Sequence, residues 1–487
     1  MKAFIGFLCK MQAKMLIACF LLLFVLPLNF YPGAENSHDP QRVVQVLVFA
    51  LFFCGYLLNF RHVSAPFVDK RVAWIFILLF VLGVFSAVFS EKRLWAFLEL
   101  ALWVCSYYAV IYCAWCFFVS RDDLLKFLIG VIVLSCGVFF FGFFVSYAAA
   151  YVSGIGIIDP WLLIGGFDNI RFFGQYAIIM LPMLAFPILN DSGFRKSAFW
   201  LLPAFWMLLI FSGTRGGWIA MAVVMACFYV IGGTVRDWSK IQFKGFCIGM
   251  TAYVVLLVLI PQVLALDLTN TASERLTLTS SGRSVLWGDA LRVWWNHLLL
   301  GIGPMHLANL GYGRAAHPHQ FLLQWGAEMG TVSFVLMVAV LWSACLAIIR
   351  HLKALGAAEL TLAHERDAMY VCTAAAVFAA LALSMVDGVF VMPTPQIWLV
   401  VLSGYLLAQH QPSALKVGRR SVREAILSST RTVVFACFTG MLCFVVQRDW
   451  SLGGYEVRAL AQEATYTGYK DIPKQPRFWL RGRIEDR

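Results

Sequence analysis

Two arginines of the chain lie beside glycines, where they could bind a phosphate group. Arg215 is flanked by glycines within residues 213–217, and Arg283 follows Gly282 at the start of an amphipathic stretch. A guanidinium group binds phosphate oxygens in bidentate pairs, and backbone N–H groups at the start of a helix also favour anions. Either arginine could instead only reach toward the membrane interface, so anion binding and a structural role both stay open.

Two histidines, His317 and His319, are separated by one proline and followed by Gln320. A histidine side chain titrates near neutral pH, so it can accept a proton from a hydroxyl group or polarise it. The i and i+2 spacing has neither a Cys partner nor an HExxH motif, so we predict no metal site and no cofactor. A buried structural histidine is the alternative.

A further polar group contains Arg171, within residues 168–175, and Asp387, at the end of an apolar run. Arg171 could contact an anionic substrate, and Asp387 could orient a histidine or an arginine. Asp387 could equally be an ordinary solvated acid in a loop. We take Arg171 and Asp387, together with Arg215, Arg283, His317 and Gln320, as candidate substrate-binding residues.

Long apolar segments must position these residues. Of the 487 residues, 61% are hydrophobic and only 13% are charged, whereas a soluble domain carries about 25% charged residues. Uncharged runs of about 20 residues recur, each long enough to cross the hydrocarbon core as a helix. We therefore predict an all-α, polytopic integral membrane protein with about 12 to 13 transmembrane helices. The thirteen candidate centres are Leu23, Phe52, Leu79, Val104, Val138, Leu181, Pro203, Val224, Val255, Met337, Val377, Val401 and Ala436.

The distribution of charge predicts the side of the membrane that each loop faces. The formal net charge of +12 comes from Lys and Arg in short loops rather than from a basic stripe with aromatic residues, so we expect no nucleic-acid binding. With the N-terminus inside, every inside loop is basic, as the positive-inside rule requires. All the polar groups described above then lie on the outer side.

The predicted organisation has four parts. Residues 1–265 contain the first nine transmembrane helices, and residues 266–318 form a long outer loop. Residues 319–447 contain the remaining transmembrane helices, and residues 448–487 form a polar outer tail. The candidate residues are thus divided between the helix ends and the long loop.

The segment from His319 to Gly330 resembles the signature of the O-antigen ligase superfamily. The shared features are the histidine, the amide after it, a leucine at Leu323 and the final glycine, all preceded by Gly-Ile-Gly-Pro at residues 301–304. The superfamily also contains O-antigen polymerases and pilin-type protein O-oligosaccharyltransferases. Where the family usually has Asn after the histidine, this chain has Gln320, which keeps the amide and changes its reach by one methylene.

Both arginines beside glycines extend the resemblance, which covers about Phe211 to Val340. Arg215 matches the family's Arg-Gly element, and Arg283 with Trp287 resembles its loop arginine motif. The resemblance implies that His319, rather than His317, acts on the acceptor hydroxyl. It also implies that the two arginines stabilise the diphosphate leaving group, so that His319, Arg215 and Arg283 form the catalytic set.

The resemblance further implies a metal-independent glycosyltransferase of a bacterial inner membrane, with the N-terminus in the cytoplasm and the active site facing the periplasm. Its donor would be a glycan on undecaprenyl diphosphate, held in the membrane lipid by its chain. The glycan would move as a block to a hydroxyl of the lipid A core or of a pilin Ser or Thr. Four tryptophans suit stacking on sugars and anchoring at the interface: Trp287, Trp294, Trp295 and Trp325.

Two alternatives to this interpretation stay open at the level of the sequence. An O-antigen polymerase would add the growing glycan to a fresh lipid-linked unit. A polysaccharide flippase or transporter would make no bond, but it should carry charges or broken helices in the middle of the membrane. The charges of this chain concentrate at the ends of the apolar runs, which favours the enzyme.

Overall fold

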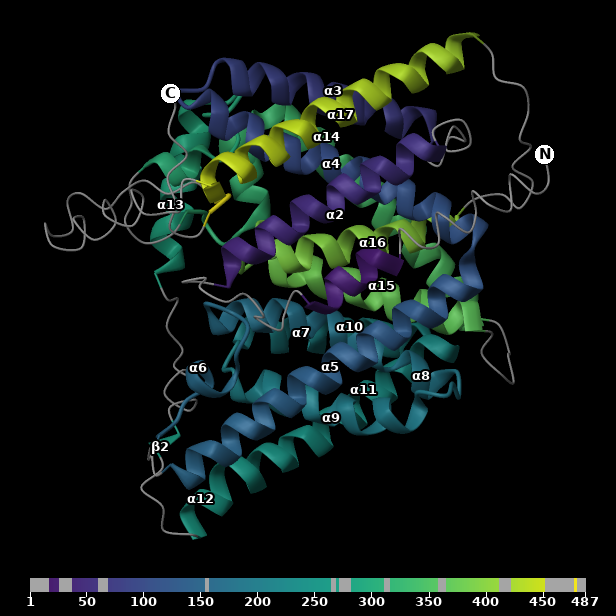
Figure 1. Cartoon of the computed structure of the whole chain (residues 1–487), viewed down its shortest axis with the longest axis vertical. Helices are drawn as coiled ribbons and strands as arrows, with labels where there is room; N and C mark the ends of the chain where they lie inside the picture. Colours follow the sequence, from purple (N-terminus) through teal and green to yellow (C-terminus); the bar gives the residue numbers. More distant parts are fainter. Residues whose placement is uncertain are drawn as a thin grey trace, which may run out of the picture.

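The computed structural model of the chain describes residues 17–25, 37–59, 69–153, 157–263, 269–270, 282–310, 316–357, 365–410, 422–451 and 477–479. These residues form a bundle of long helices, most of which run roughly alongside one another (Figure 1). The predicted all-α membrane architecture is therefore confirmed. Within the described residues, the only strand pairing is a two-residue parallel ladder between β1 (Ile157–Ile158) and β2 (Thr269–Asn270).

The described helices follow one another along the chain. They are α2 (His38–Asn59), α3 (Lys70–Val88), α4 (Arg93–Val119), α5 (Arg121–Val152), α6 (Pro160–Leu163), α7 (Ile170–Leu184), α8 (Phe186–Leu189), α9 (Arg195–Phe211), α10 (Arg215–Ile231), α11 (Gly233–Tyr253), the π-helix η2 (Val254–Leu259), α12 (Ile260–Val263), α13 (Arg283–Asn296), the 3-10 helix η4 (His306–Leu310), α14 (Phe321–Ala357), α15 (Glu365–Ser384), α16 (Pro393–Gln409) and α17 (Val422–Ser451).

All thirteen expected span centres lie in helical segments of the described residues. Nine helices of the described part are long and apolar enough to cross a membrane, counting α7 with α8, and α11 with η2 and α12, as continuous helices. The helices α9, α10 and α16 have 17 residues each, and at 1.5 Å per residue they extend about 26 Å. Three of the expected spans therefore correspond to helices that are shorter than the roughly 20 residues of a typical transmembrane helix.

Glycines allow two helix pairs of the bundle to pack closely. A Cβ on Gly404 of α16 would lie 2.5 Å from the Cβ of Cys113 in α4, and one on Gly249 of α11 would lie 2.6 Å from the carbonyl oxygen of Pro203 in α9. In a membrane, helices associate through close packing and hydrogen bonds rather than through the hydrophobic effect, so small residues at contacts matter. These glycines therefore hold α4 against α16 and α9 against α11.

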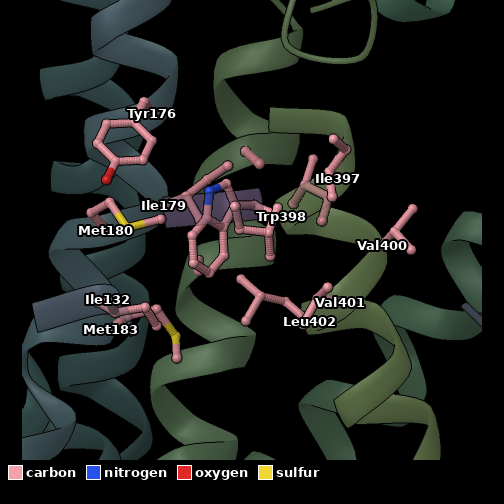
Figure 2. Packing of buried hydrophobic residues seen from close by; sticks show 14 of the residues in the cluster. Ile132, Tyr176, Ile179, Met180, Met183, Ile397, Trp398, Val400, Val401 and Leu402 are labelled. Carbon is pink, nitrogen blue, oxygen red and sulfur yellow. The ribbon is translucent and has the colours of Figure 1, made fainter. Parts of the chain in front are cut away.

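Large buried side chains fill the space between the helices. Figure 2 shows Ile179 and Met180 of α7 pointing toward Trp398 of α16, which lies at the centre of this cluster. Trp398 and both α7 residues are fully buried. Since α7 and α16 are joined to α15 and α4 by further packing, the cluster fixes α7 relative to the loop between α15 and α16. Both of these elements carry residues of the site described next.

Candidate active site

An open cavity of about 370 Å³ lies among the ends of five helices, α6, α7, α10, α13 and α15. Three arginines line it, and each lies in the first turn of its helix: Arg171 in α7, Arg215 in α10 and Arg283 in α13. Asp387, in the loop after α15, is the one carboxylate among the described lining residues. The full lining is Trp161, Asn169, Ile170, Arg171, Gly174, Ser212, Gly213, Thr214, Arg215, Gly216, Gly217, Arg283, Leu383 and Asp387.

The placement of these arginines is electrostatically unfavourable without an anion. The first turn of a helix is its positive end, where acidic side chains are stabilising and basic ones are not. Here three helix starts converge on one cavity, each with an arginine and none with an acid in the first turn. The cavity therefore concentrates positive charge at the starts of helices, which is an arrangement that binds phosphate.

Arg283 shows how close the positive charges lie. Burial lowers the pKa of its guanidinium, and the nearby Arg171 and Arg215 lower it further, while Asp387 opposes this shift. Its Nε atom is buried and makes no hydrogen bond within the described structure. An anion in the cavity would supply the acceptor that this group lacks.

His319 lies next to the cavity, beside Asp387. Its Nδ1 is 3.5 Å from Asp387 Oδ1, a long separation of the kind that tightens when substrate binds. Gln175 Nε2 donates to the same carboxylate oxygen at 3.1 Å, and the backbone N–H of Gly388 donates to it at 2.7 Å. Asp387 is thus fixed in place, and it links the histidine to the arginine-lined cavity.

The backbone at His319 is strained, whereas His317 is part of the packing around it. His319 has a φ of 53°, a left-handed conformation that costs a non-glycine residue about 1–3 kcal/mol and is typical of functional positions. His317 is buried, and its Nδ1 accepts a hydrogen bond from the backbone N–H of His319 at 3.2 Å. Its ring lies so close to Gly388 that a Cβ there would be 2.3 Å from the imidazole Cε1. His317 therefore orients His319 and is not itself presented to the cavity.

Gln320 caps the helix that follows it. Its Oε1 accepts a hydrogen bond from the backbone N–H of Leu323, at the start of α14. Its Nε2 lies 4.0 Å from the sulfur of Met385. None of His317, His319 and Gln320 is itself among the cavity-lining residues, and His319 is joined to the cavity through Asp387.

The glycines of the sequence signature meet at one backbone contact. Helix α14 is interrupted at Gly330, which has a φ of 76° and leaves the carbonyls before it without helical partners. The N–H groups of Ile302 and Gly303 donate to the carbonyls of Ala327 and Glu328 at 3.0 and 3.1 Å. A Cβ on Gly301 would be 2.3 Å from the carbonyl carbon of Glu328. Glycine is therefore required on both sides of this contact, which docks the long loop on α14.

Tryptophans attach α13, and with it Arg283, to the His319 loop. Trp287 Nε1 donates to the carbonyl of Pro318 at 3.0 Å, and Trp294 Nε1 donates to Thr331 Oγ1 at 3.1 Å. Trp325 stacks on Trp103. These three tryptophans are partly buried and contact other segments of the chain, whereas Trp295 is 77% exposed. Their suitability for stacking on sugars stays a prediction.

A buried ionic cluster lies behind the site, and sequence reasoning did not find it. Arg477 contacts Glu328 through two hydrogen bonds of 2.6 and 2.7 Å, and it contacts Glu99 at 3.3 Å. All three side chains are buried, and the two carboxylates raise the pKa of the Arg477 guanidinium despite its burial. A glutamate inside an apolar run, as at Glu99, requires a partner in the membrane, and this was the available signal.

The described residues contain no group of three or more His, Cys, Asp or Glu side chains that could hold a metal ion. His317 and His319 have ring centroids 4.2 Å apart, but the Nδ1 atom of His317 is occupied by the backbone N–H of His319. The chemistry that the described side chains offer is therefore anion binding by arginine and proton transfer by histidine.

Comparison with known proteins agrees with this chemistry. Residues 198–338 match the family model described as O-antigen ligase, a segment that contains Arg215, Arg283 and His319 but neither Arg171 nor Asp387. No curated protein matches the chain. The match supports glycosyl transfer of the ligase or polymerase type, with a lipid-linked glycan donor and an acceptor. Residues 198–338 of this multi-pass membrane protein are thus similar to the O-antigen ligase family, which agrees with the resemblance seen in the sequence.

Proposed function

We propose that the chain transfers a glycan as a block from undecaprenyl diphosphate to an acceptor hydroxyl, without a metal ion. One observation supports this most strongly: three arginines at three helix starts line one cavity, and Asp387 joins that cavity to His319. A diphosphate matches the excess of positive charge, and a hydroxyl is the group on which a histidine acts.

In the proposed reaction, the bond between the anomeric carbon of the glycan and the diphosphate oxygen breaks, and a bond from that carbon to the acceptor oxygen forms. The arginines Arg171, Arg215 and Arg283 stabilise the negative charge that develops on the leaving diphosphate. His319 Nε2 accepts the proton of the acceptor hydroxyl, and its Nδ1 faces Asp387, which stabilises the resulting imidazolium. Undecaprenyl diphosphate is the second product.

We propose that the cavity faces the periplasm and that the N-terminus lies in the cytoplasm. Helix α9 begins with Arg195 and Lys196 and ends just before Ser212, which lines the cavity. Helix α10 begins at the cavity with Arg215 and leads to Arg236 and Lys240 in α11. The basic ends thus lie opposite the cavity, and basic ends face the cytoplasm.

A transfer assay with purified protein tests the proposal. The donor is undecaprenyl-diphosphate-linked glycan in detergent with EDTA, and separate reactions contain lipid A core, pilin or additional donor as acceptor. A product that carries the whole glycan, absent with His319→Ala, supports the proposal, and the acceptor used distinguishes ligase, protein transferase and polymerase. Donor translocation across proteoliposomes with no product in any reaction would instead indicate a flippase.

A further inference from the structure

The segment Arg477–Trp479 of the C-terminal tail lies inside the bundle, far along the chain from the site. Arg477 and Phe478 are buried at 5% and 0% exposure. Trp479 Nε1 donates to Asp449 Oδ2 of α17 at 2.7 Å. The segment is therefore held by specific contacts on the helical core, although the tail is polar overall.

Arg477 reaches the loop that carries His319 by two routes. Its Nη1 donates to the carbonyl of Ala316 at 3.3 Å, three residues before the histidine. Its guanidinium group also donates to both carboxylate oxygens of Glu328. Glu328 Oε1 in turn accepts a hydrogen bond from the backbone N–H of Leu307 at 3.1 Å. One side chain thus joins the His319 loop, α14 and the end of the long loop.

Arg42 joins the same segment to the loop that carries Asp387. Its Nε donates to the carbonyl of Phe478 at 3.2 Å and its Nη2 to the carbonyl of Arg477 at 3.3 Å. The same Nη2 donates to the carbonyl of Val391 at 2.8 Å. Asp387 and His319 lie on different loops, and the tail segment contacts one of them directly and the other through Arg42.

We propose that Arg477 is a positioning residue of the active site: the tail segment Arg477–Trp479 fixes the His319 loop relative to the Asp387 loop. The part of this inference that is measured as a rate of glycan transfer rests on the proposed function. A displacement of about 1 Å between catalytic groups can lower a rate about 100-fold. A tie between the two loops therefore acts on turnover rather than on donor binding, because the three arginines of the cavity lie on α7, α10 and α13.

Two variants of the full-length protein separate positioning from folding. Arg477→Lys keeps the buried positive charge but loses the planar fork that reaches Ala316 and both oxygens of Glu328 at once. The double variant Arg477→Gln with Glu328→Gln removes one charge of each sign, so the net charge of the cluster is unchanged, and Glu99 is left as its buried carboxylate. Arg292→Gln is the matched control, because Arg292 is 74% exposed on α13.

Two readouts are measured for each variant that elutes as a monodisperse species in gel filtration. We expect kcat for glycan transfer to fall about 10- to 100-fold in both test variants with little change in donor KM, and to be unchanged in the control. We also expect faster modification of His317, 7% exposed in the native fold, by diethyl pyrocarbonate, located by mass spectrometry.

Native kcat and native protection of His317 in the folded variants would overturn the proposal. If the double variant does not fold, Arg477→Lys decides alone. If the wild type transfers no glycan, the proposed function fails, while the His317 modification still decides whether Arg477 positions the loop.

Discussion

The chain holds two groups of arginines that differ in charge balance. At the cavity, Arg171, Arg215 and Arg283 line one space with a single carboxylate among the described lining residues, Asp387. Behind the site, Arg477 lies between two buried carboxylates, Glu99 and Glu328, within 3.3 Å of both. The first group has an excess of positive charge and opens to solvent, whereas the second is enclosed and has an excess of negative charge.

This difference separates a binding role from a structural role. In the Arg477 cluster, the Nη atoms bind Glu328 and Glu99, so the positive charge is paired inside the protein. The buried Nε of Arg477 makes no hydrogen bond within the described structure. The cavity arginines lie at helix starts, and the pKa of Arg283 is lowered first by burial and then by the nearby Arg171 and Arg215, while Asp387 raises it. An excess of positive charge at helix starts favours the binding of an anion.

The largest expected effect is on turnover, at His319. His319→Ala should lower kcat about 10²- to 10⁴-fold and leave donor binding intact, because the histidine acts on the acceptor proton. His319→Asn is a second variant, since asparagine tolerates the left-handed backbone at this position. His317→Ala should cost much less. The measurement is product formation by each variant. If His317→Ala forms no product while His319→Ala remains active, then His317 is the catalytic histidine and His319 is not.

The next effect is on stability, at the enclosed cluster. Glu328→Ala leaves Arg477 with Glu99 alone, and we expect the free energy of unfolding to fall by about 3–5 kcal/mol, the usual cost of breaking a buried ion pair. The measurement is denaturant unfolding in mixed micelles. Asp237→Ala is the control, because the Asp237–Lys240 pair of α11 is exposed and should matter by less than about 1 kcal/mol. Equal losses in the two variants would remove the contrast between enclosed and exposed pairs.

At the cavity, replacement of the planar guanidinium group of Arg215 should lower activity without lowering stability. Arg215→Lys should lower glycan transfer about 10²- to 10³-fold, as removal of a group that stabilises the leaving charge does. The free energy of unfolding should be unchanged, since the charge at the helix start is kept. Arg292→Lys on the exposed face of α13 serves as control. Normal donor turnover by Arg215→Lys would argue against a bidentate diphosphate contact.

The smallest effect is a pH dependence of stability from His317. Burial, together with His319 and Arg477, holds the pKa of His317 well below its ordinary value in the folded state. The unfolded chain therefore binds more protons below about pH 6.5, so stability is complete above that pH and falls as the pH drops toward the folded-state pKa, by at most about 1.4 kcal/mol per pH unit. His317→Gln should flatten the decline in thermal unfolding midpoints between pH 7.5 and 5. An unchanged slope would assign the decline to other groups.

The sequence alone was sufficient for the helices and for the residues near helix ends. Apolar runs located all thirteen helical centres, and the glycines beside Arg215 and Arg283 correctly marked the starts of α10 and α13. Local patterns of this kind depend on neighbouring residues, so they can be seen in a sequence.

Contacts between distant segments could not be predicted in the same way. Asp387 lies 68 positions after His319, and Arg477 lies 149 positions after Glu328, so no periodicity relates them. The role of Gln320 as a helix cap depends on where α14 begins, and a boundary of that kind is the least certain part of a sequence-based prediction. The tail was expected to be a polar outer segment, and three of its described residues, Arg477, Phe478 and Trp479, are buried.

Binding of undecaprenyl diphosphate, the proposed second product, tests the central claim most directly. Purified wild-type protein should unfold at a temperature that rises with the concentration of this lipid, since a ligand that binds the folded state stabilises it. The double variant Arg215→Lys with Arg283→Lys should lose most of that rise, while Arg292→Lys should keep it. An equal rise in the double variant and the wild type would contradict the claim that the arginine-lined cavity holds the diphosphate.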